Sequence, residues 1–333
     1  MKQTLTDANF PRTADLRVYH LGLRPGEVAN RIVTVGSPSR AYAIAAHFDA
    51  APAPRFELAS ERGFLTLTGR YKGVPLSVVS IGMGHPNVDF FVREVRECLA
   101  GDMLIVRLGS CGALIDVPVG SVVLPTSSVA VERNLDFDFV HPETCAEEPY
   151  RISKPATPDA AAPIVPACAN ASADSFYSSQ GRQTSFPDAN GDLIARLQGA
   201  VPGLATFECW RGRPAALPPR RPPLATAPVR VTTASTSFVP PSAPSETTDK
   251  AEKQEAAKAK QDAPLAGPHT RIRAAAAQMV FAARASRAFI TPGEVAVLEG
   301  WTGRGVLDAL AATPLADDRV HPEAGSVWAL SAA

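Results

Sequence analysis

The sequence predicts an α/β protein built on a layered sheet. Short apolar or β-branched runs typical of strands alternate with segments of helical spacing from residue 31 to about residue 135. Glycine-containing turns separate many of these segments. The chain has 333 residues, enough to bury a substantial core, and its 45% hydrophobic and 20% charged content is ordinary for a soluble globular protein. We therefore expect a sheet flanked by helices.

The composition argues against several classes of function. A formal net charge of zero favours neither a nucleic-acid partner nor an anionic membrane. The residues Met1–Phe10 lack an apolar signal sequence, and there is no run of about 18 apolar residues that would span a membrane. Five scattered cysteines without CxxC spacing predict neither a zinc site nor a disulfide framework. We expect a cytoplasmic protein.

The first strand and its turn have the pattern of an anion site. Arg31–Val35 is a β-branched run that predicts a strand, and residues 41–48 follow with helical spacing. Between them lies Gly36-Ser-Pro-Ser-Arg40. A glycine turn at a helix N-terminus presents free N–H groups and the positive end of the helix dipole to an anion. The alternative is a plain strand–helix connection.

A hairpin and an amphipathic helix come next. Phe64–Thr68 and Leu76–Ser80 predict two strands joined around Tyr71–Val74, with a charged patch at residues 59–62 ahead of them. A glycine-rich loop at residues 81–87 leads to a helix at 88–99. Its apolar stripe, which we assign to the core, is Phe91, Val92, Val95 and Leu99.

A second candidate anion site follows a central strand. Met103–Val106 is a short apolar run, and Arg107, Gly109 and Ser110 come directly after it. A glycine permits close approach of a ligand to the backbone, and the guanidinium fork suits a phosphate. Ligands of open α/β sheets collect at the carboxyl ends of strands. The alternative is a glycine-bearing turn with a surface arginine.

The second half of the chain is less regular. The pattern weakens after Pro142 and resumes near Asp174. Further predicted elements are strands at 120–124, 203–208 and 272–281, a short helix at 193–197, and one or two helices at 292–310. Residues 211–268 are rich in proline, arginine, serine and threonine, then in alanine, lysine and glutamate without an apolar face. We expect this stretch to be a disordered low-complexity insertion.

Several of these motifs, in their order along the chain, resemble the nucleoside phosphorylase superfamily and within it the uridine phosphorylases. In that family a Gly-x-Pro-x-Arg loop binds phosphate, which matches Gly36 to Arg40. A second phosphate arginine ends a central strand before a Gly-Thr/Ser stretch, which matches Arg107 with Gly109 and Ser110. A third, contributed by the neighbouring subunit, matches Arg62 in Ala59-Ser-Glu-Arg62. The histidine of His20-Leu-Gly-Leu23 matches one that reaches the neighbour's ribose.

The resemblance is most specific in the motif that selects the base. Uridine phosphorylases contain Phe-Tyr-x-x-Gln-x-Arg, which matches Phe176-Tyr-Ser-Ser-Gln-Gly-Arg182. The chemistry is reasonable in its own right, because the amide of Gln180 can donate and accept as a uracil edge requires. Arg182 can donate to a carbonyl that gains negative charge, and Phe176 can stack on the base. The alternative is a polar loop with a buried phenylalanine.

The resemblance implies a fold, a reaction and an assembly. The fold is a single α/β domain with a twisted, mixed central sheet, here formed by residues 16–210 and 270–315, with tails at 1–15 and 316–333. The reaction is phosphorolysis of uridine to uracil and ribose 1-phosphate, with Arg107 and Arg182 as catalytic residues. Inorganic phosphate is the co-substrate, and no cofactor is needed. Family members form homodimers or hexamers of dimers with shared active sites. Where some relatives bind potassium through a glutamate, this chain has Gly63, so we predict no metal.

The sequence departs from the family beside the sugar site. The family's Glu-Met-Glu motif, whose second glutamate grips the ribose diol, is here Glu208-Cys209-Trp210. Glu208 and His20 are then the candidate ribose-binding residues. The abrupt change of composition inside the motif suggests that residues 209–268 are translated intron or frameshifted sequence, with a genuine regulatory insertion as the alternative. Besides an active uridine phosphorylase, the sequence allows a catalytically impaired relative that binds nucleoside or oligomerises. A purine-directed phosphorylase and a hydrolytic nucleosidase are further alternatives.

Overall fold

The computed structural model describes residues 4–50, 55–156, 168–208 and 270–330, most of which surround one mixed sheet. Its strands are β3 (Arg31–Val35), β4 (Phe56–Ala59), β5 (Leu65–Tyr71), β6 (Val74–Ser80), β7 (Met103–Ala113), β8 (Val122–Val123), β9 (Ser127–Arg133), β10 (Tyr150–Ile152), β11 (Ala169–Ala173), β12 (Leu204–Glu208), β13 (Ile272–Ala283) and β14 (Ala288–Phe289). The helices are α1 (Pro38–Ala45), α2 (His85–Cys98), α3 (Leu193–Ala200) and α5 (Pro292–Ala312). The strand order is β10-β9-β11-β12-β7-β3-β6-β5-β4, and β13 lies beside β7. The α/β class with a mixed sheet is therefore confirmed.

Strand β7 is the centre of the sheet. Along one edge it pairs in parallel with β13 from Met103 to Ala113. Along the other it pairs in parallel with β3 from Leu104 to Arg107, and then antiparallel with β12 at Gly112 and Ala113. The partner on this second edge therefore changes between Arg107 and Gly112. Crevices at such changes of partner are where open α/β sheets bind ligands.

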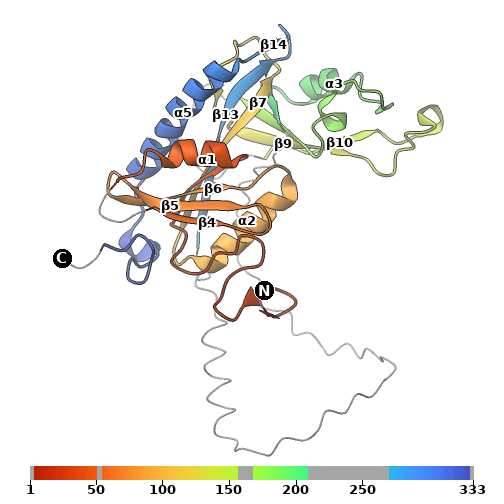
Figure 1. Ribbon diagram of the computed structural model, residues 1–333. Helices are drawn as coiled ribbons and strands as arrows, with labels where there is room; N and C mark the ends of the chain where they lie inside the picture. Colours follow the sequence, from red (N-terminus) through yellow and green to blue (C-terminus); the bar gives the residue numbers. More distant parts are fainter. Residues whose placement is uncertain (1–3, 51–54, 157–167, 209–269, 331–333) are drawn as a thin grey trace, which may run out of the picture.

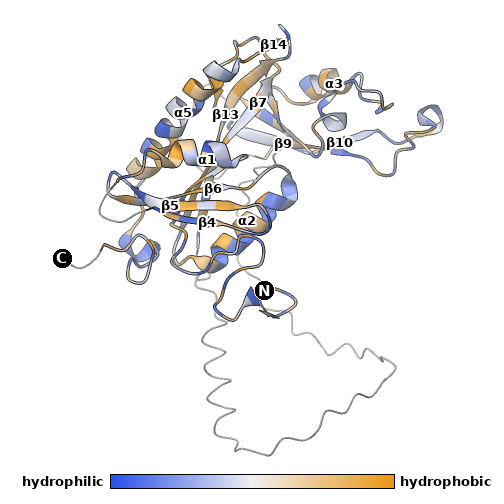
Figure 2. Ribbon diagram, in the orientation of Figure 1, coloured by the Kyte–Doolittle hydropathy of each residue, from blue (hydrophilic) through white to orange (hydrophobic). Residues whose placement is uncertain are grey.

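Helices cover both faces of the sheet (Figure 1). On one face α1 and α5 pack on apolar side chains of β3, β5, β6 and β13, such as Val33, Leu67 and Met279. On the other face α2 buries Phe91 and Val95 against Ile32 and Val79. In Figure 2 α2 shows hydrophobic and hydrophilic turns together, as expected for a helix with one face on the sheet. Helix α3 closes the end formed by β11 and β12.

Most predicted elements are present, with corrected boundaries. The strand at 31–35 and the hairpin are confirmed, the latter with Lys72 and Gly73 between its strands. The helix expected at 41–48 begins earlier, at Pro38, because Ser37 caps it and proline fits its first turn. The central strand does not end at Val106, and its glycines belong to β7 rather than to a turn. Continuous pairing with β13 keeps these residues extended.

The C-terminal segment packs against the amino end of β7. The guanidinium of Arg319 donates to Asp102, and the backbone N–H of Ala100 donates to Nδ1 of His321 at 3.0 Å. Trp328 is buried, with 3% of its surface exposed. Residues 316–330, which we labelled a tail, therefore contribute to the domain core. The predicted disordered insertion and the proposed intron lie outside the described residues.

Candidate active site

A cavity of about 380 Å³ opens where β7 changes partners. Eight residues singled out from the sequence line it: Gly36, Arg40, Arg107, Ser110, Phe176, Gln180, Arg182 and Glu208. They come from five parts of the chain: the β3–α1 turn, α1, β7, the residues after β11, and β12. Apolar side chains, among them Phe207 and Phe281, complete its wall. One cavity thus brings together the candidate phosphate-binding and base-binding residues.

Two arginines and a helix N-terminus form one side of the cavity. The side chain of Ser37 accepts a hydrogen bond from the backbone N–H of Arg40 at 3.4 Å and caps α1. Gly36 lies beside Arg107, because a Cβ at Gly36 would stand 3.4 Å from a guanidinium nitrogen of Arg107. This side of the cavity is therefore suited to an anion.

Arg107 is a buried cation. It is 5% exposed, and burial lowers its pKa to about 10. The negative charge of Glu208 opposes this shift, and the positive charge of Arg40 adds to it. At neutral pH the guanidinium remains charged. A bound anion would compensate the cost of burying it.

Helix α5 fixes Arg40. The Nε of Arg40 donates to Oε1 of Glu299 at 2.7 Å, and its guanidinium carbon lies 5.7 Å from the ring centre of Phe281. Both arginine and glutamate are largely buried, with side-chain exposures of 9% and 17%. Neither Glu299 on α5 nor Phe281 on β13 was predicted as a partner, because both lie more than 200 residues further along the chain.

A second group of residues that line the cavity contains an amide, a guanidinium and an aromatic ring. Arg182 lies over the ring of Phe176, 4.1 Å from its centre, and its Nε donates to the carbonyl oxygen of Phe176 at 3.0 Å. Gln180 is 1% exposed, and its backbone carbonyl accepts from the guanidinium of Arg284 at 3.1 Å. The ring of Phe176 is half exposed, at 49%. A planar heterocycle could stack and hydrogen-bond here.

Glu208 is held by its neighbours in the sheet. The Nδ2 of Asn170 donates to Oε1 of Glu208 at 3.1 Å, and the hydroxyl of Thr206 donates to Oδ1 of Asn170 at 2.8 Å. All three side chains are buried. The carboxylate at the end of β12 therefore has a fixed orientation at the cavity.

His20 and Arg62 do not line this cavity. The ring of His20 contacts Oε1 of Glu94 through Nδ1 at 2.6 Å and stacks on Phe90 with ring centres 3.7 Å apart. Arg62, in the turn between β4 and β5, lies over the ring of Tyr19 and hydrogen-bonds its hydroxyl. Within one chain, these two candidates form a separate cluster.

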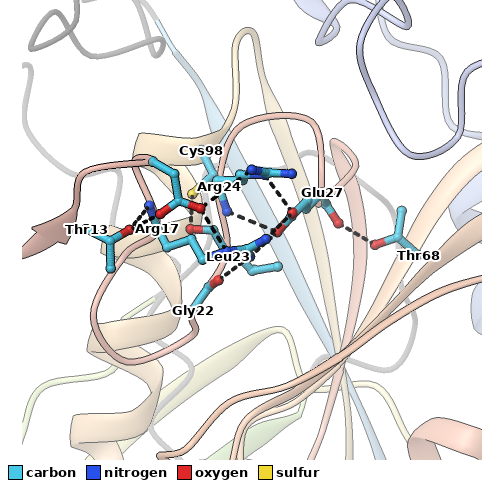
Figure 3. A network of polar contacts seen from close by, with 9 residues as sticks. Thr13, Arg17, Gly22, Leu23, Arg24, Glu27, Thr68 and Cys98 are labelled. Atoms are coloured by element: carbon cyan, nitrogen blue, oxygen red, sulfur yellow. Dashed lines mark hydrogen bonds and ion pairs between the residues drawn. The ribbon is translucent and has the colours of Figure 1, made fainter. Parts of the chain in front are cut away.

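A polar network holds the loop on which His20 lies (Figure 3). The guanidinium of Arg17 binds both carboxylate oxygens of Glu27 at 2.8 Å and also donates to the carbonyl of Gly22 at 2.7 Å. Glu27 also accepts from Nε of Arg24, and its backbone carbonyl accepts from Thr68. The carboxylate of Glu27, which is 3% exposed, therefore holds the loop together, and its backbone carbonyl joins the loop to β5.

Arg284, which donates to the backbone of Gln180 beside the cavity, was not predicted from the sequence. It follows directly after β13, just as Arg107 lies within β7 beside the same cavity. A basic residue at the carboxyl end of an apolar strand was the signal that could have indicated it.

No helix of the described chain is long and apolar enough to cross a membrane. Within the described ranges, no three His, Cys, Asp or Glu side chains cluster as metal ligands.

The chain is similar in sequence to known nucleoside phosphorylases. Residues 30–200 match the family model described as the phosphorylase superfamily. A uridine phosphorylase of Thermococcus kodakarensis is 29% identical over 216 residues, which are 60% of this chain and 72% of the relative. A DeoD-type purine nucleoside phosphorylase of Geobacillus kaustophilus is 39% identical over 110 residues, which are 33% of this chain and 45% of the relative.

Solved structures extend the likeness beyond the segment that the family model matches. One, from a study of two uridine phosphorylases of the oomycete Phytophthora capsici, has a TM-score of 0.70 and 32% identity. The match covers 94% of this chain and 100% of that one. A nucleoside phosphorylase of Trypanosoma brucei, at 18% identity and a TM-score of 0.58, matches 91% of this chain and 100% of its own, and supports the fold.

Proposed function

Because the chain belongs to the phosphorylase superfamily, we propose that it catalyses the phosphorolysis of uridine to uracil and ribose 1-phosphate. The observation that supports this best is that one cavity is lined by Arg40 and Arg107 and also by Phe176, Gln180 and Arg182. The first group is suited to phosphate, and the second to the edge of a pyrimidine.

The proposed chemistry needs no nucleophile from the protein. The glycosidic bond loosens to an oxocarbenium-like ribose, and bound phosphate attacks the anomeric carbon. Arg107 and Arg40, with Gly36 and Ser110, hold the phosphate dianion beside the developing positive charge. Gln180 and Arg182 stabilise the uracil anion as it leaves, and Glu208 is placed to bind the ribose.

Purine specificity is the first alternative. The DeoD-type relatives are labelled purine nucleoside phosphorylases, and they match at higher identity over a shorter segment. We favour the pyrimidine because Gln180 supplies both a donor and an acceptor, as the N3–H and adjacent carbonyl of uracil require. Hydrolysis is less favoured, because Arg40 and Arg107 in the cavity, together with Arg62, are suited to binding phosphate.

A catalytically impaired enzyme is the second alternative. Trp210 stands where the family's ribose-gripping glutamate is expected, and it lies outside the described residues. Such a chain would bind nucleoside or oligomerise without turnover.

We also propose a cytoplasmic homodimer or hexamer with shared active sites. His20 and Arg62 lie outside their own chain's cavity, so a role at the site requires a second copy. The scattered cysteines are free wherever the structure describes them, at positions 98, 111, 145 and 168, which suits a reducing compartment.

Release of uracil from uridine tests the reaction. The purified full chain is assayed with uridine, with inosine, and with uridine in the absence of phosphate. The proposal expects uracil release that depends on phosphate and is slow or absent with inosine. Faster turnover of inosine would support the purine alternative, and turnover without phosphate would support a hydrolase. Binding of uridine without product would indicate an impaired enzyme.

A further inference from the structure

A buried amide behind the cavity has no visible partner. Gln278 on β13 is 1% exposed, and neither Oε1 nor Nε2 has a hydrogen-bond partner within the described part of the chain. A buried amide without partners costs free energy, so native proteins normally satisfy such groups through protein atoms, ligands or ordered water. The position of Gln278 therefore requires an explanation.

The register of β13 places Gln278 beside the cavity arginine. Gln278 pairs with Gly109 of β7, and Ala276 pairs with Arg107. Because side chains alternate along a strand, Arg107, Gly109 and Gln278 lie on the same face of the sheet. A Cβ on Gly109 would stand 2.5 Å from Oε1 of Gln278, so the amide occupies the space above this glycine. It therefore lies diagonally from Arg107, two residues further along the paired strands.

Thr34 flanks Arg107 on the other side. It pairs directly with Arg107 across β3 and β7, so it shares the same face. Thr34 is fully buried, and its hydroxyl also has no partner among the described residues. Two buried polar groups without partners thus lie on either side of one buried guanidinium. Such a setting favours ordered water, which needs two to four polar partners.

We propose that Gln278 and Thr34 are positioning residues for Arg107. Ordered water held by the amide and the hydroxyl orients the guanidinium toward the anion in the cavity. Neither residue lines the cavity, so they act on phosphate through Arg107. This inference rests on the proposed function, because it assigns phosphate as the ligand of that arginine.

The test separates phosphate affinity from stability. In Gln278→Leu a side chain of similar size lacks the amide, so KM for phosphate should rise about tenfold while KM for uridine changes less than about twofold. The melting temperature should stay the same or rise, since removing a buried polar group of this kind is neutral or stabilising. Thr34→Val should raise the phosphate KM in the same direction. Titration calorimetry with inorganic phosphate should give a parallel weakening.

Thr66→Val is the matched control. Thr66 on β5 is also buried with an unpartnered hydroxyl, and it lies in the same row of the sheet but two strands from β3. Its substitution should leave the phosphate KM unchanged. Should Gln278→Leu fail to fold, Gly109→Ala replaces it, because the added methyl displaces the amide. The positioning role and the proposed function are contradicted by different results. If the Gln278→Leu enzyme is active and its phosphate KM is unchanged, only the positioning role is overturned. A wild-type chain that binds no phosphate overturns both.

Discussion

At the scale of single residues, Arg107 is the charge on which the proposed reaction depends. It is almost fully buried, and it is the last residue of β7 that pairs with β3 before β12 becomes the neighbouring strand. Its lowered pKa shows that burial outweighs the attraction of Glu208. A protein retains such a buried charge at a cost in stability, and binding of an anion is a function that explains the cost.

Substitution of Arg107 should therefore separate activity from folding. Arg107→Met retains the volume of the side chain and removes the charge. We expect phosphate-dependent kcat/KM to fall about a thousandfold, as for the loss of one preorganised donor to the reacting group. The protein should remain folded, and added phosphate should no longer raise its melting temperature. Retained phosphate-dependent turnover would place the phosphate site elsewhere.

Gln180 should determine the choice of base. In Gln180→Ala the uracil edge loses its donor and acceptor, so kcat/KM for uridine should fall about a hundredfold relative to inosine. Gln183→Ala is the control, because Gln183 bonds Asn190 and is absent from the cavity wall. Competition between uridine and inosine in one assay measures the ratio. An unchanged preference would refute the assignment of this loop.

Sequence reasoning found these residues because each belongs to a short local motif. Gly36 to Arg40 and Phe176 to Arg182 can be identified without knowing what packs against them. Glu299 and Gln278 could not be found in this way, and for Arg284 the only local signal was its place after an apolar strand. Each acts at a distance, through helix packing or strand register, and such relations appear once the chain is folded.

At the scale of elements, apolar content decided what could be predicted. Strands β3, β6 and β13 are runs of apolar residues and were expected from the sequence. Strand β11 was missed because its sequence, Ala-Asn-Ala-Ser-Ala, has no β-branched or large apolar residue. Its five residues are nonetheless buried between β9 and β12, where small side chains fit and where Asn170 orients Glu208. Tertiary packing overrides intrinsic preference at this strand.

Helix α5 provides a local test of stability. Thr291 caps it: its hydroxyl accepts from the N–H of Glu294 at 3.4 Å, and the Glu294 carboxylate accepts from the N–H of Thr291 at 2.8 Å. Thr291→Ala should lower the free energy of unfolding by about 1 kcal/mol, measured by urea denaturation. The phosphate KM should stay the same, because Glu299 lies about two turns beyond the cap. An unchanged midpoint would show that this cap does not stabilise the helix.

At the scale of the whole molecule, the C-terminal segment should make stability depend on pH. Burial lowers the pKa of His321, whose Nδ1 accepts from the N–H of Ala100. The folded state thus binds fewer protons than the unfolded state just below pH 6.5. The stabilisation is present above that pH and is lost as pH falls through the lowered pKa.

Hydrogen exchange of residues 316–330 at pH 7.5 and pH 5 measures this effect. The protection factors of these amides, which correct for the slower intrinsic exchange at low pH, should be smaller at pH 5. The control is His321→Asn, which can keep an acceptor for Ala100 and does not titrate in this range. An equal loss of protection in both proteins would assign the effect to other groups.

The assembly can be tested by mixing two inactive chains. Arg107→Ala damages the cavity of its own chain, whereas Arg62→Ala should damage the cavity of its neighbour. Each homodimer then has two defective sites. A mixed dimer has one intact site, formed by the cavity of the Arg62→Ala chain and the Arg62 of the other. Random exchange of equal amounts should therefore restore about a quarter of wild-type activity per chain, because half of the dimers are mixed and each has one intact site.

Arg62 lies over Tyr19 and does not line the cavity of its own chain. Recovery of activity would explain this position, because Arg62 would then serve the cavity of the neighbouring chain. If exchange is verified by labelled subunits and activity stays absent, Arg62 does not serve a shared site.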